Sequence, residues 1–162
     1  MVALTCTAQA ALVSQGDGTV KDTNTNLIWL QDWNVNGEQN WVTQKAWAET
    51  TLDGFAGSND WVLPSISEYA LFRAYGDLTS NLLPFVNVYA RYWSGTESVP
   101  GIDAWAFSPG FGFQSSGSMD VPLYAVAVRP GDVTASVPEP QTLVLVLLAL
   151  GATVVARRRR SR

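Results

Sequence analysis

The stretch DWVLPSISEYALF, residues 60–72, predicts a sharp change from extended chain to helix. Ser65 and Glu68 have the spacing of a capping box, in which each side chain bonds the backbone N–H of the other residue. We therefore expect a helix from Ile66 to about Tyr75 that ends at Gly76.

Two further elements are predicted on the N-terminal side of this helix. Strand-like runs at 19–21 and 27–30 are joined by turn-forming residues at 22–26, a pattern that predicts a hairpin. Asn40 is suited to cap a second helix that runs from about Trp41 to Leu52. One face of that helix is formed by Trp41, Lys45, Ala48 and Leu52.

After Pro84 the pattern changes to short strands separated by Gly, Pro, Ser and Asp. The four runs are RYWSGTE (91–97), DAWAFSPG (103–110), GFGFQSS (110–116) and YAVAVRP (124–130). A hairpin, two helices and then a meander of strands predict a single α+β domain over residues 11–130. A polar linker follows at 131–137.

Charge is distributed unevenly along the chain. All fourteen acidic residues lie between Asp17 and Glu139, whereas five of the ten basic residues lie in the C-terminal tail. The part before the arginine block at 157–162 therefore carries a net charge of −9. Such a surface repels nucleic acid, and we expect no nucleic-acid partner.

The residue types also argue against an enzyme. The chain has no histidine, and its one cysteine is Cys6. Nucleophilic sites that need histidine are therefore excluded, and the nitrogen and sulfur ligands of zinc are missing. A pair of carboxylates could still hydrolyse a glycoside, but no spacing singles out a pair. We expect a protein that is not an enzyme and that has no cofactor.

The segment WSGTESVPGIDAW, residues 93–105, contains the candidate ligand-binding residues. A carboxylate beside a tryptophan at the mouth of a loop could bind calcium and a sugar hydroxyl, although no calcium signature supports a metal. A solvated turn between two strands is the alternative, and we favour it. Of the seven tryptophans we expect four or five in the core. The candidate residues are Trp93, Glu97, Asp103 and Trp105.

The C-terminal tail, VPEPQTLVLVLLALGATVVARRRRSR (137–162), predicts a membrane segment. Its uncharged run at 143–156 would span about 21 Å as a helix, and Gln141 with Thr142 extends it to 141–156. A buried core helix is the alternative reading of such a short run. The arginines that follow are expected to stop transfer and stay in the cytoplasm. They are Arg157, Arg158, Arg159 and Arg160.

The N-terminus carries part of an export signal. The sequence AQA at residues 8–10 is a small-x-small site suited to signal peptidase. The preceding residues lack both a positive n-region and a long apolar stretch, so we interpret residues 1–10 as the remnant of a signal peptide. An ordinary N-terminal tail is the alternative.

The tail resembles a PEP-CTERM sorting signal, with Pro138, Glu139 and Pro140 as the motif at 138–162. The resemblance implies export in a Gram-negative bacterium that makes exopolysaccharide, and processing by an exosortase. We expect a precursor anchored in the inner membrane with its domain outside the cytoplasm. After processing it would reside at the cell surface or in the biofilm matrix.

Residues 16–130 resemble the DUF1566 family, also called the Lcl C-terminal domain. The residues that match its pattern include Asp60, Trp61, Leu63, Pro64, Tyr92, Trp93, Ser94, Thr96, Val128 and Arg129. Val62 stands for an arginine of the pattern, and Gly95 for a serine. The resemblance implies a fold similar to C-type lectin-like domains, and some members are adhesins that bind polysaccharide. We therefore expect a polysaccharide-binding module, the alternative being a structural coat protein without a small ligand.

Overall fold

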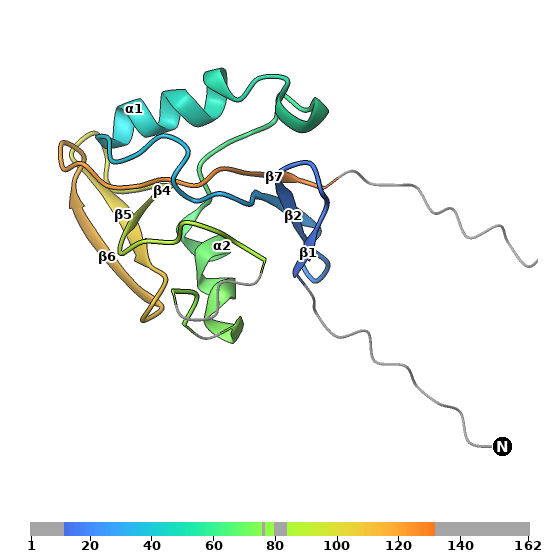
Figure 1. Ribbon diagram of the computed structural model, residues 1–162. Coiled ribbons are helices and arrows are strands. Elements are labelled where there is room, and N and C mark those ends of the chain that lie inside the picture. Colours follow the sequence, from blue (N-terminus) through green and yellow to red (C-terminus); the bar gives the residue numbers. More distant parts are fainter. Residues whose placement is uncertain (1–11, 76, 80–83, 132–162) are drawn as a thin grey trace, which may run out of the picture. The chain divides into compact units, whose positions relative to one another are not determined.

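The computed structural model describes residues 12–75, 77–79 and 84–131 (Figure 1). The chain divides into two units, 1–131 and 132–162, and every described residue belongs to the first. The strands are β1 (Leu12–Ser14), β2 (Thr19–Asp22), β3 (Leu27–Leu30), β4 (Tyr92–Val99), β5 (Asp103–Ser108), β6 (Phe113–Ser118) and β7 (Val128–Pro130). The α-helices are α1 (Trp41–Ala46) and α2 (Ile66–Leu71), with short helical turns at Trp47–Thr51, Phe55–Gly57 and Phe72–Tyr75.

The predicted hairpin forms the centre of a four-stranded antiparallel sheet in the order β1-β2-β3-β7. Asp22 closes its turn by accepting a 2.9 Å bond from the backbone N–H of Asn24. β7 lies beside β3, with Arg129 opposite Ile28. The meander prediction was therefore wrong for the end of the run at 124–130, because Val128–Pro130 extend the first sheet. The start of the run keeps a single parallel bridge to β4, between Tyr124 and Tyr92.

The other three predicted runs form the second sheet, in the order β4-β5-β6. The β4–β5 ladder is irregular between Trp93 and Glu97, where a bulge interrupts the register. Gly95 lies in this bulge and donates a 2.8 Å bond to the carbonyl oxygen of Pro64. A Cβ at position 95 would lie 2.8 Å from the carbonyl oxygen of Leu63, which explains why a glycine stands here.

The capping box at Ser65 is confirmed. The Ser65 hydroxyl accepts a 3.2 Å bond from the N–H of Glu68, and the Glu68 carboxylate accepts a 2.6 Å bond from the N–H of Ser65. α2 continues as a 3₁₀ turn to Tyr75, so the helical stretch matches the prediction to that residue, and Gly76 lies outside the described residues.

α1 begins where predicted, with Asn40 accepting a 2.8 Å bond from the N–H of Thr43. Its second half is a π-helix over Trp47–Thr51, where the Thr50 hydroxyl donates a 2.6 Å bond to the carbonyl oxygen of Ala46. Trp41, Ala48 and Leu52 of the predicted face are buried, together with Trp47 of the π-helical turn. Lys45, which was predicted on the same face, lies instead at the surface and pairs with Glu49 at 3.4 Å.

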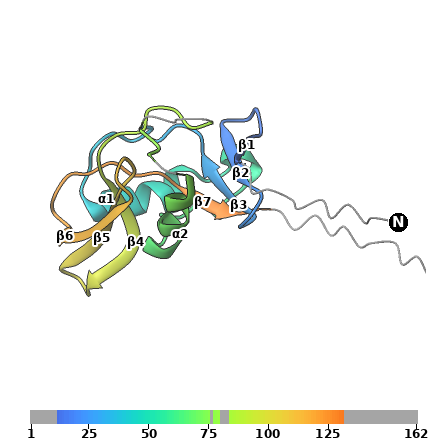
Figure 2. The same cartoon turned by 90° about the horizontal axis from the view of Figure 1, so that it is seen from below.

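In both views α2 lies between the sheet of β4, β5 and β6 and the sheet that contains β3 and β7 (Figures 1 and 2). An aromatic cluster includes rings from both sheets and from α2. Trp33 is its centre, with ring centroids 5.0 Å from Tyr92 and 5.1 Å from Phe85. Six tryptophans are buried, so our expectation of four or five was too low. The buried ones are Trp29, Trp33, Trp41, Trp47, Trp61 and Trp93.

Among residues 12–75, 77–79 and 84–131, no helix is long and apolar enough to cross a membrane. The predicted span at 141–156, the sorting motif at Pro138–Pro140 and the signal remnant at 1–10 all lie outside the described residues.

Candidate functional site

The four residues predicted from sequence do not form one open site. Trp93 is fully buried, and its indole N–H donates a 3.3 Å bond to the carbonyl oxygen of Val121. It therefore packs in the core and presents no face to a ligand. Trp105 is half-buried on the central strand β5, opposite Ser116.

Glu97 and Asp103 lie at the two ends of the β4–β5 turn. The exposed Glu97 carboxylate accepts a 2.8 Å bond from the N–H of Gly101, which closes the turn. Asp103 is half-buried and pairs with Val99. Across the described ranges, no group of three or more His, Cys, Asp or Glu side chains is placed to hold a metal ion. Glu97 and Asp103 thus lie in and beside a turn that joins β4 to β5.

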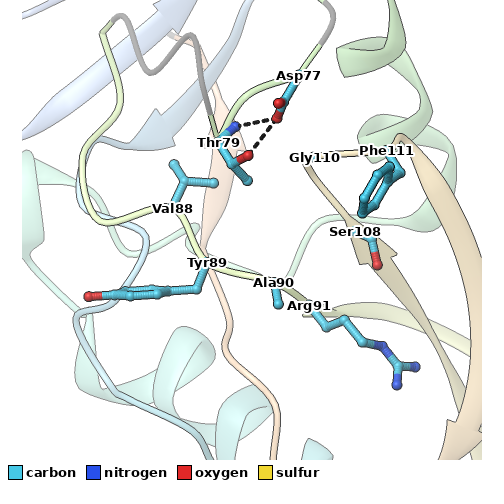
Figure 3. A pocket seen from close by; sticks show the side chains of 9 residues that line it. All are labelled: Asp77, Thr79, Val88, Tyr89, Ala90, Arg91, Ser108, Gly110 and Phe111. Carbon is cyan, nitrogen blue, oxygen red and sulfur yellow. Dashed lines mark hydrogen bonds between the residues drawn. The ribbon is translucent and has the colours of Figure 1, made fainter.

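A cleft of about 580 Å³ lies elsewhere, at the β5–β6 end of the second sheet (Figure 3). Three segments supply its walls: 77–79, 88–91 and 108–111. The lining residues are Asp77, Thr79, Val88, Tyr89, Ala90, Arg91, Ser108, Gly110 and Phe111. Its volume is in the range of small-ligand pockets, which is about 300–1,000 Å³.

The first wall is shaped by a local turn. The Asp77 carboxylate accepts bonds from both the backbone N–H and the hydroxyl of Thr79, at 2.8 and 2.6 Å. Leu78 between them is buried, and its N–H donates a 3.4 Å bond to the carbonyl oxygen of Pro109. A Cβ at Gly110 would lie 3.3 Å from the Thr79 hydroxyl oxygen, so a glycine allows the two walls to approach this closely.

The second wall is held by tyrosines. The Tyr92 hydroxyl accepts a 2.6 Å bond from the N–H of Tyr89 and donates a 3.3 Å bond to the carbonyl oxygen of Asn87. The Tyr89 ring stacks on Tyr124, with centroids 4.8 Å apart. Burial raises the pKa of the Tyr92 hydroxyl well above its usual value, so this hydroxyl stays protonated and keeps donating.

The third wall ends in two exposed aromatic rings. Phe111 is 80% exposed and Phe113 is 68% exposed, and their rings stack at 6.0 Å with an angle of 21° between planes. The turn is closed by the N–H of Gly112, which donates a 2.9 Å bond to the carbonyl oxygen of Ser108. Phenylalanine normally lies in the core. Two stacked phenylalanine rings in solvent beside a cleft therefore indicate a surface that contacts a ligand or a partner.

Arg91 places a cation at the edge of the cleft. Its guanidinium donates a 3.0 Å bond to the hydroxyl of Ser115 on β6, which fixes its direction away from the cleft floor. We call the segment 88–90 the floor of the cleft; it is apolar at Val88 and Ala90, and the Phe111 ring lies across the cleft from Val88 (Figure 3). Chemically, the site offers ring stacking, an apolar floor and hydroxyls at its rim.

Sequence reasoning missed this cleft. The alternation of FGF at 111–113 indicates a strand, and a phenylalanine in a strand is ordinarily assigned to the core. The glycines at 110 and 112 were the available signal, because they place Phe111 in a turn and not within the ladder.

Comparison with protein-family models gives two matches. The PEP-CTERM protein-sorting motif matches residues 136–160, as predicted from the tail. This motif marks an exported protein that is processed at the membrane by an exosortase. A search of curated proteins finds no significant match. The model of the Lcl C-terminal domain matches residues 18–129, more than half of the chain, and the chain therefore belongs to the Lcl C-terminal domain family.

Proposed function

We propose that this exported protein is a polysaccharide-binding module and that the cleft around Phe111 is its binding site. In this proposal the domain binds and does not catalyse. The stacked, exposed pair Phe111–Phe113 beside the cleft carries the proposal. An aromatic face can pack against the apolar C–H face of a sugar ring, and two adjacent rings can follow successive sugars of a chain.

The fold supports the same proposal. The two antiparallel sheets with two short α-helices are compatible with a C-type-lectin-like domain, which the family resemblance implies. The Gly95 N–H in the β4 bulge bonds the Pro64 carbonyl oxygen at 2.8 Å and so connects this sheet to the chain before the capped α2. A rigid sheet presents the Phe111 turn with little entropy to lose on binding.

The proposed location rests on the signal-peptide remnant at 1–10 and on the sorting signal at 138–162. After signal peptidase acts near residue 10, the precursor would be anchored in the inner membrane through residues 141–156. Exosortase processing at Pro138–Pro140 would then deliver the domain to the cell surface or the biofilm matrix, where exopolysaccharide is its partner.

A structural coat protein without a small ligand is the rival function. The burial of six tryptophans favours it, because a lectin-like site commonly stacks a tryptophan on its sugar. In that case the exposed phenylalanines would contact another protein.

Retention of the full chain, kept in mild detergent, on the exopolysaccharide of its own host tests the proposal. We expect saturable retention that Phe111→Ala weakens at least about fivefold, because one lost ring removes about 1–3 kcal/mol of stacking and contact. Ile102→Ala is the matched control, since Ile102 is 63% exposed and directly precedes β5, at the end of the strand opposite to Phe111.

Absence of retention of the unaltered chain, with and without calcium, would contradict the proposal and favour the coat protein. Equal weakening by both substitutions would place the binding surface elsewhere.

A further inference from the structure

We propose that the cleft selects neutral glycans that carry a methyl group on the sugar, as an acetyl substituent or as the methyl of a 6-deoxy sugar. This inference rests on the proposed function and names the chemistry that the site recognises.

The first argument comes from the apolar side chains that line the floor of the cleft. Val88 is partly buried against the core, and the exposed Ala90 is the other small apolar side chain of the lining. The Phe111 ring covers the opposite side (Figure 3). None of these side chains can accept or donate a hydrogen bond. A sugar hydroxyl placed on this floor would lose its water without gaining a partner from them, whereas a methyl group would gain apolar contact.

The second argument comes from the hydroxyl groups at the rim of the cleft. Thr79 gives its hydroxyl proton to Asp77, which leaves its oxygen as an acceptor that faces the cleft. Ser108 contributes a second hydroxyl to the lining, from the end of β5. These groups suit the ring hydroxyls of a sugar whose apolar substituent enters between them. Polar groups at the edge and an apolar floor together orient such a substituent inward.

The third argument comes from the charge of the lining and of the domain around it. Asp77 is the acidic residue of the lining, and the chain before its arginine tail carries a net charge of −9. The guanidinium of Arg91 is already bonded to Ser115. Arg91 keeps its positive charge in this bond and balances Asp77 within the lining. The repulsion of an anionic sugar therefore comes from the net charge of the domain as a whole, and a neutral acetylated or deoxy sugar does not meet it.

The test compares glycans that differ in the methyl group. The full chain in mild detergent is immobilised, and binding is measured for acetylated glucomannan, for the same polymer after mild alkali has removed its acetyl esters, and for a rhamnan. We expect the acetylated polymer to bind about tenfold or more tightly than its deacetylated form, because loss of a group that fills an apolar pocket has an effect of this size. Tight binding of the rhamnan would identify the 6-deoxy methyl as the recognised source.

A pair of variants tests whether the floor of the cleft causes the preference for the acetylated polymer. Ala90→Ser adds a hydroxyl to the floor and should reduce the preference for the acetylated polymer several-fold. Ala46→Ser makes the same change at an exposed position of α1 and should leave the preference unaltered.

The outcomes separate the two proposals. Equal binding of both glucomannans, with no binding of the rhamnan, overturns the inference and leaves polysaccharide binding in place. A preference that Ala90→Ser does not change overturns the assignment to this cleft. Retention on the host exopolysaccharide without binding of any of the three polymers overturns the inference alone. Loss of that retention as well overturns the proposed function.

Discussion

Two phenylalanines four residues apart have opposite surroundings. Phe107, on β5, is buried, and its ring stacks on Tyr69 at 4.9 Å and 16°. Phe111, in the turn after β5, is 80% exposed and stacks on Phe113, which is itself exposed. The side-chain chemistry is the same, so the difference arises from what the backbone places around each ring. One ring stabilises the fold, and the other is available to a ligand.

The comparison extends to the regions that contain these rings. The aromatic cluster around Trp33 includes rings from both sheets and from α2, so each ring is fixed by several others. The pair Phe111–Phe113 has one ring partner for each member among the described residues. Substitutions in the first region should change stability, and substitutions in the second should change binding.

Trp33→Ala should have the largest effect. Trp33 is fully buried, and removal of its ring leaves a large cavity among five aromatic neighbours. We expect a loss of about 3–5 kcal/mol in the free energy of unfolding, measured by urea titration. A loss below about 1 kcal/mol would mean that the cluster does not hold the two sheets together.

Gly95→Ala should come next. The new Cβ would lie 2.8 Å from the carbonyl oxygen of Leu63, so the β4 bulge or the chain before α2 must move. We expect a loss of about 1–3 kcal/mol in the same titration. Gly117→Ala is the matched control on β6, because its Cβ would meet nothing within 4 Å. Equal effects of the two substitutions would contradict the close approach at Gly95.

Alkaline pH should lower the free energy of unfolding through the buried tyrosines. Burial raises the pKa of Tyr69 and of Tyr92 in the folded state. The unfolded chain then loses these protons from about pH 10, whereas the folded chain retains them. The free energy of unfolding is therefore at its full value below pH 10 and falls as the pH rises toward the folded-state pKa values.

Tyr92→Phe sharpens this prediction. It removes one of the two groups, so the fall in stability above pH 10 should be shallower than in the unaltered chain. At neutral pH it should lower stability by about 1 kcal/mol, because the N–H of Tyr89 loses its 2.6 Å partner. An unchanged alkaline slope, measured by urea titrations at several pH values, would show that Tyr92 does not titrate differently in the folded state.

Phe111→Ala should have the smallest effect on stability, within about 0.5 kcal/mol, because its ring is already in solvent. The same substitution should have the largest effect on polysaccharide retention. A clear loss of stability would show that the exposed pair supports the β5–β6 turn and would weaken its assignment as a binding surface.

Much of the fold could be predicted because its signals are local. The caps at Asn40 and Ser65 depend on residues within one helical turn, and the hairpin of β2 and β3 depends on a short run of turn formers. The pairing of β7 with β3 joins residues about a hundred positions apart. No local pattern shows that β7 pairs with β3 and not with β6, and the meander prediction was wrong for this strand.

The candidate site was harder to predict, because exposure is a tertiary property. Trp93 and Trp105 share the sequence features of a ligand-stacking residue, yet Trp93 is completely covered by the fold. Phe111 looks like a strand residue, yet the turn at Gly110 and Gly112 holds it in solvent. Alternation along a strand predicts which side chains share a face, but not which face is covered.

The central claim is that the exposed phenylalanines, and not the native tryptophans, meet the ligand. Fluorescence of Phe111→Trp tests it most directly, with the unaltered chain titrated in parallel against the host exopolysaccharide. The account predicts a saturable change of emission in the variant and almost none in the unaltered chain, whose tryptophans are buried except for the half-buried Trp105. An equal change in both chains would place the ligand at a native tryptophan such as Trp105 and contradict the account.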